Sequence, residues 1–71
     1  MNISIRGHIL NNFKDSSEND IRSSIEDAVK DNDEITLPGL GVFFEALWNE
    51  SSKEEKDFII KTLYKNLKKN N

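Results

Sequence analysis

The sequence has no cysteine, only one proline and a single histidine among its 71 residues. Without cysteine, the chain can form no disulfide, no thiolate metal site and no thiolate nucleophile. The single histidine, His8, cannot build a metal site with histidine partners. No apolar run approaches the ~20 residues that a membrane-spanning helix needs. The N-terminus also lacks the long apolar stretch of a secretory signal peptide, so neither secretion nor membrane insertion is expected.

Basic charge is also scarce. The net charge is −3 at pH 7, and the sequence pI is about 5.0. Because a DNA-binding protein gains much of its affinity from the counterions that a basic face releases, this composition argues against generic coating of DNA. One local basic patch is formed near the C-terminus by Lys61, Lys65, Lys68 and Lys69. We interpret these lysines as charges that complement a helix dipole and keep the chain soluble.

The spacing of apolar residues predicts four helices, over about residues 3–13, 18–30, 38–49 and 53–68. Ser17 is predicted to cap the second helix, and Ser52 with Glu55 matches a capping box for the fourth. The cluster 31–33 is a turn signal, and Asn70 and Asn71 are expected to fray. We therefore predict an all-α fold, a small bundle of about four short helices, in which residues 1–71 form a single domain.

The segment 36–50 is the most informative part of the chain, because it gathers large apolar side chains without a charge until Glu45. Thr36 is predicted as its N-cap, and Pro38 suits the first turn of a helix. Helical spacing then links Leu40, Phe43, Phe44, Leu47 and Trp48.

Two interpretations of this segment remain open. Gly39 and Gly41 are costly inside a helix, and the close approach of another helix backbone would account for them. The alternative is an extended strand and turn over residues 34–44. Trp48 is expected to anchor the core because one tryptophan buries a large area. Glu45 is expected to face solvent or to pair with a lysine.

The search for chemistry finds no catalytic, cofactor-binding or metal-binding residue. The serines lie mostly in polar turns and caps, and His8 has no evident partner that would orient it as a base. The acidic run 31–34 lacks the glycine and the final glutamate of a calcium loop. Gly39-Leu40-Gly41 lies in no βαβ unit and is not a dinucleotide fingerprint. We therefore predict that the protein is not an enzyme and needs no cofactor.

The stretch LPGLGVFFEALW resembles the small acid-soluble spore protein I family of spore-forming Firmicutes, whose members carry LPGLGVLFE followed by an apolar pair and tryptophan. The resemblance covers nearly the whole chain. It implies a non-enzymatic protein made in the developing forespore and resident in the spore core, with a packing, protective or interaction role. It assigns no catalytic or ligand-binding residue. The residues that carry it, and that we predict as family motif and core, are Leu37, Pro38, Gly39, Leu40, Gly41, Val42, Phe44, Glu45 and Trp48.

A second resemblance leads to an alternative function. Two helices followed by residues 35–45 resemble the N-terminal half of HU-type DNA-bending proteins, which would imply a small nucleic-acid-binding protein. The chain lacks the Arg- and Lys-rich β-ribbon arms through which such proteins insert into the minor groove. No partner is named by the sequence. A homo-oligomer is one expectation, because the segment 36–50 carries many large apolar side chains for a single short bundle.

Overall fold

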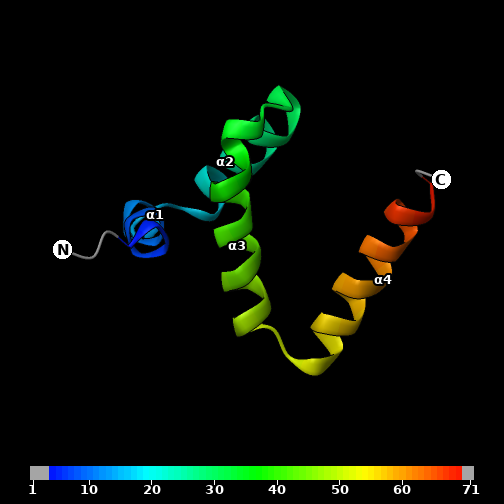
Figure 1. Ribbon diagram of the computed structural model, residues 1–71. Helices are drawn as coiled ribbons and strands as arrows, with labels where there is room; N and C mark the ends of the chain where they lie inside the picture. Colours follow the sequence, from blue (N-terminus) through cyan, green and yellow to red (C-terminus); the bar gives the residue numbers. More distant parts are fainter. Residues whose placement is uncertain (1–3, 70–71) are drawn as a thin grey trace.

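The computed structural model describes residues 4–69 and is an all-α small bundle, as predicted (Figure 1). No strand is present within these residues. The elements are α1 (Ile5–Phe13), α2 (Glu18–Asp31), the short 3-10 helix η1 (Glu34–Thr36), α3 (Leu37–Glu50) and α4 (Lys53–Lys69). The predicted helix boundaries hold to within two residues wherever they fall in the described part. Ile3, Asn70 and Asn71 lie outside it.

The first two helices are bounded by local hydrogen bonds. The Ser4 hydroxyl accepts a bond from the backbone N–H of Gly7 at 3.0 Å and begins α1. Ser17 and Asp20 form a reciprocal capping box at the start of α2. The helix α2 ends where Asn32 adopts the left-handed conformation with φ 52°. The predicted cap and turn therefore act where the sequence places them.

The chain enters α3 through η1 rather than through a side-chain cap. The Asp33 carboxylate accepts a bond from the N–H of Ile35 at 3.1 Å. Thr36 is the N-cap residue of α3, as predicted, but its hydroxyl donates to the Asp33 carbonyl at 2.7 Å and makes no capping hydrogen bond to the helix. Pro38 lies in the first turn of α3, as predicted. The helical interpretation of this segment is confirmed and the strand alternative is wrong.

The two glycines of α3 do not mark a close approach between helices of one chain. A methyl group built at Gly39 or at Gly41 would meet no other atom within 4 Å, outside the residue's chain neighbours and the helix backbone around it. Both residues keep ordinary helical backbone angles, since no glycine has a positive φ. The expectation that another helix backbone lies against them is therefore wrong within this chain.

A short turn of two serines joins α3 to α4. The N–H of Ser51 donates to the Trp48 carbonyl at 3.2 Å, and its hydroxyl donates to the Leu47 carbonyl at 2.6 Å. Ser52 and Glu55 form the predicted capping box, with bonds of 2.8 and 3.2 Å. After this turn α4 diverges from α3, so that the two helices form a V (Figure 1).

The bundle is loosely closed. The main contact between α-helices joins α1 to α3, and α2 lies behind the upper part of α3 in Figure 1. None of the described residues is fully buried, so the apolar seam between α1, α2 and α3 is half-buried at most. The HU-like alternative is not favoured, because the residues that would lead into a β-ribbon form α3 and α4 instead.

Candidate functional site

An apolar groove of about 570 Å³ lies between α1, α2 and α3. One charged residue, Lys14, lies among its lining residues. The other lining residues are apolar, and in chain order they are Leu10, Phe13, Ile21, Ile25, Leu40, Phe43, Phe44, Ala46 and Leu47. We call this feature the apolar groove.

Helical spacing places these side chains on facing surfaces. Leu40, Phe43 and Leu47 are spaced by three and four residues, so they share one face of α3. Ile21 and Ile25 share a face of α2 for the same reason. The ring of Phe13 from α1 meets the ring of Phe43 edge to face, with centroids 4.9 Å apart and planes at 83°. This pairing, which aromatic quadrupoles favour, joins α1 to α3 at one end of the groove.

Trp48 lies beyond this groove, near the turn into α4. It is half-buried and stacks on Phe44, with centroids 6.0 Å apart and planes at 25°. The Lys56 ammonium from α4 lies 5.3 Å from the centroid of the Trp48 ring, a cation–π distance. Trp48 was expected to anchor the core. The structure instead places it between α3 and the first turn of α4, where it remains partly accessible.

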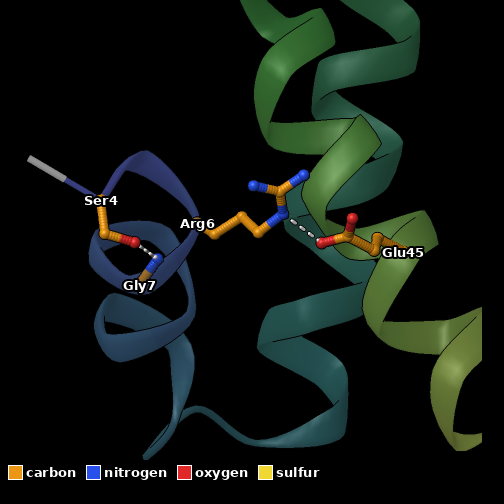
Figure 2. Close-up of polar contacts among 4 residues, drawn as sticks. All are labelled: Ser4, Arg6, Gly7 and Glu45. Atoms are coloured by element: carbon orange, nitrogen blue, oxygen red, sulfur yellow. Dashed lines mark hydrogen bonds and ion pairs between the residues drawn. The ribbon is translucent and has the colours of Figure 1, made fainter.

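An ion pair joins α1 to α3. The Arg6 guanidinium on α1 donates to the Glu45 carboxylate on α3 at 2.5 Å (Figure 2). This hydrogen bond holds the pKa of Glu45 below its usual range and raises the pKa of Arg6. Glu45 was expected to face solvent or to pair with a lysine; its side chain is 44% exposed, and its partner is an arginine.

The nine motif residues are distributed over several faces of α3 rather than gathered at one site. Leu40 and Phe44 line the apolar groove. A second hollow, of about 460 Å³ between α1 and α3, is lined in part by Pro38, Gly41, Val42 and Glu45. A third hollow, of about 420 Å³ against α2, is lined in part by Leu37 and Leu40. Gly39 is half-buried, and Trp48 stacks on Phe44 as described above.

Several groove residues lie outside the motif. Phe43, Ala46 and Leu47 come from α3 itself, and Phe13 and Ile25 come from the other two helices. The helical periodicity of each segment carried the signal for these residues, because it identified one apolar face per helix. Periodicity did not identify that the apolar faces of α1, α2 and α3 line one groove. The ion pair of Arg6 with Glu45 had no sequence signal, since 39 positions separate its members.

The described residues offer no constellation for catalysis or metal binding. Among residues 4–69 there is no group of three or more His, Asp or Glu side chains placed to hold a metal ion. The only described groups with clearly shifted pKa values are Arg6 and Glu45, which form an ion pair with each other. None of the described helices combines the length and hydropathy that a membrane crossing requires. The feature that remains on the described part of the chain is the apolar groove, carried by a small all-α bundle.

Known proteins of one family are similar to the chain over nearly its whole length. Residues 3–67 match the family described as small, acid-soluble spore protein I. Proteins of that name from Bacillus cereus and Bacillus mycoides are each 38% identical to the chain over 69 residues, and one from Bacillus anthracis is 36% identical. Each alignment covers 97% of this chain and all of the relative. No solved structure is significantly similar.

The chain belongs to the small, acid-soluble spore protein I family. It is therefore a sporulation protein of a family that is not a known family of enzymes.

Proposed function

We propose that the protein is a non-enzymatic component of the spore core that acts by apolar packing against another protein surface. The observation that carries the proposal is the apolar groove, which is walled by aliphatic and aromatic side chains from α1, α2 and α3. Such a surface contributes free energy through the burial of apolar area, and Lys14 is the one ionisable side chain among its lining residues. The names of the relatives support the location in spores.

The net charge supports packing over DNA coating. The chain carries 13 acidic and 10 basic residues, and most of its acidic residues precede α4. A protein that coats DNA must bring several cations to the phosphates at once. In this chain the cations of α4 lie on a helix that also exposes apolar side chains, which favours a protein surface as the partner.

Fractionation of spores tests the location. The protein would be followed by immunoblot through vegetative cells, mother-cell lysate, coat extract and the acid extract of decoated spores. We expect it to be confined to the forespore and to the acid extract of decoated spores. Equal amounts in vegetative cells, or loss of the protein with the coat, would contradict the proposal.

A further inference from the structure

The single chain exposes far more surface than a compact protein of its mass. Its accessible surface is 6535 Å², whereas a folded monomer of 8.2 kDa is expected to expose about 4,500 Å². Its Cα radius of gyration is 13.8 Å, compared with about 11 Å for a compact domain of this length. The excess is therefore about 2,000 Å² per chain. A surface of that size indicates an element that lacks its packing partner.

Among the described elements, α4 carries the most exposed large apolar side chains. Its apolar residues recur at intervals of three and four, so they form one stripe along the helix. Leu63, Tyr64 and Leu67 in the distal half are 44%, 59% and 58% exposed. Ile60 is 49% exposed, and only Ile59, nearer the turn, is half-buried. We call the set Ile59, Ile60, Leu63, Tyr64 and Leu67 the α4 stripe.

The apolar groove and the α4 stripe are complementary in chemistry. The groove is lined by apolar side chains, and the stripe presents apolar side chains over more than two helical turns. Laying an amphipathic helix into an apolar groove is a recurring mode of recognition, with anchors at positions i, i+3, i+4 and i+7. The α4 stripe supplies anchors at this spacing, with Ile60, Leu63, Tyr64 and Leu67 at these four positions.

The parts of the chain that carry the two surfaces have opposite net charges, although the one charged residue lining the groove, Lys14, is basic. The helix α4 carries six lysines and three acidic residues, a net charge of +3. Residues 4–50 carry ten acidic and four basic residues, a net charge of −6. The distal half of α4, residues 58–69, has four lysines and no acid. Opposite potentials steer such surfaces together and set their orientation.

The turn between α3 and α4 indicates which chain supplies the α4 that occupies the groove. It favours a second copy of the chain over the same copy. Ser51 and Ser52 form bonds on both sides of the turn, and Lys56 holds α4 beside Trp48. In this arrangement α4 diverges from α3, and its distal half stands apart from α3 (Figure 1). Folding α4 back would break these contacts, whereas docking into another copy would keep them.

We propose that two copies of this chain exchange α4, each inserting its α4 stripe into the apolar groove of the other. A two-fold arrangement makes the two contacts identical, as in domain-swapped homodimers. Burying the excess surface of both chains would remove about 4,000 Å² from water, which lies within the range of obligate dimers. The inference names the occupant of the groove and rests on the proposed packing role, but not on the location in the spore.

Sedimentation equilibrium of the purified protein at micromolar concentration tests the inference. We expect a particle of two chains for the wild-type protein. Leu63→Glu in the α4 stripe should weaken the dimer at least about 100-fold, because each dimer contains the change twice at desolvated positions. Circular dichroism should show unchanged helix content, since Leu63 is 44% exposed in the single chain.

Phe58→Glu is the matched control. Phe58 lies on the same helix and is 71% exposed, but it sits about 140° around the helix from Leu63. It should leave the dimer within a few-fold of wild type. Equal effects of the two substitutions, or a wild-type chain that sediments as a monomer, would overturn the inference while leaving the groove open to another protein partner.

Cross-linking distinguishes exchange from closure within one chain. Because the sequence has no cysteine, Leu47→Cys and Leu63→Cys can be made singly and mixed. A short bis-maleimide reagent should then join one variant to the other. If the double variant cross-links only within its own chain and the mixture gives no joined product, α4 closes on its own groove and the exchange is ruled out.

Discussion

Individual residues set the ends of the helices. Asn32 is the one described residue other than glycine with a positive φ, and it stops α2 before η1 begins. Asparagine tolerates this conformation better than most residues, because its short polar side chain bonds locally. The sequence predicted the turn here from the polar cluster 31–33, without the left-handed conformation of Asn32.

Substitution of Asn32 tests its conformational role. Asn32→Ala should lower the free energy of unfolding by about 1–2 kcal/mol, because a Cβ without a compensating polar group is strained at this φ. Asn32→Gly is the matched control and should leave stability unchanged or raise it slightly. Urea unfolding followed by circular dichroism measures both. A neutral alanine variant would argue against the left-handed turn.

The pair of Arg6 with Glu45 makes stability depend on pH. Because the pKa of Glu45 is lowered in the folded chain, the pair contributes above the unfolded value of about 4.3. That contribution is lost as pH falls through the lowered folded pKa. We expect a small loss of stability on acidification that Glu45→Gln reduces. Glu50→Gln, which changes a residue without an ion pair among the described residues, should not reduce it.

At the scale of the elements, two glycines lower the helix propensity of α3. No contact within the same chain explains why glycine is needed at these positions. Gly39 and Gly41 weaken the helix, yet a methyl group at either position would meet no other atom within 4 Å. Gly39→Ala and Gly41→Ala should therefore each raise the free energy of unfolding by about 1 kcal/mol. Chemical unfolding measures the change. A loss of stability at either position would show that another backbone lies there in the assembled protein.

Gly7→Ala serves as the comparison within α1. A methyl group there would lie 3.0 Å from the Ser4 hydroxyl oxygen, which caps this helix through the N–H of Gly7. The gain in helix propensity is opposed by displacement of the cap, which is worth about 1 kcal/mol. We expect a smaller gain than at Gly39 or Gly41. A gain equal to theirs would show that the Ser4 side chain moves aside freely.

The sequence predicts the elements better than their arrangement. Ser17, and Ser52 with Glu55, act on neighbours three residues away, so their roles as caps follow from local spacing. The Thr36 hydroxyl donates to the Asp33 carbonyl instead of accepting a capping hydrogen bond from the helix. Both bonds would join residues close in sequence, and residue propensity does not predict which of them forms. The divergence of α4 depends on the geometry of a turn and on contacts between distant segments, which spacing within one helix does not encode.

The candidate site, too, was predicted only in part from the sequence. The apolar faces that line the groove follow from periodicity in each helix, as for Leu40 and Phe43 in α3. That Phe13 meets Phe43 edge to face depends on the angle between α1 and α3. The family motif was identified from its residues, but its distribution over three hollows became visible only in the fold.

At the scale of the whole molecule, the single chain has little enclosed interior. None of the described residues is fully buried, so the free energy available from apolar burial within one chain is small. If two chains exchange α4, association adds to the stability of the fold, so stability depends on protein concentration. We expect the midpoint of thermal unfolding to rise across a hundredfold increase in concentration. A midpoint independent of concentration would indicate that each chain unfolds alone.

Most contacts in this chain join residues that are close in sequence. The contact of α1 with α3 is the main contact between α-helices that are not adjacent in sequence. Chains with such low contact order reach their native topology within microseconds to milliseconds, because little chain entropy is lost before the first stabilising contacts form. Rapid formation of single-chain bundles would then precede the slower, bimolecular exchange of α4. Refolding after dilution from denaturant would accordingly show two kinetic phases, and only the second would accelerate as the protein is concentrated.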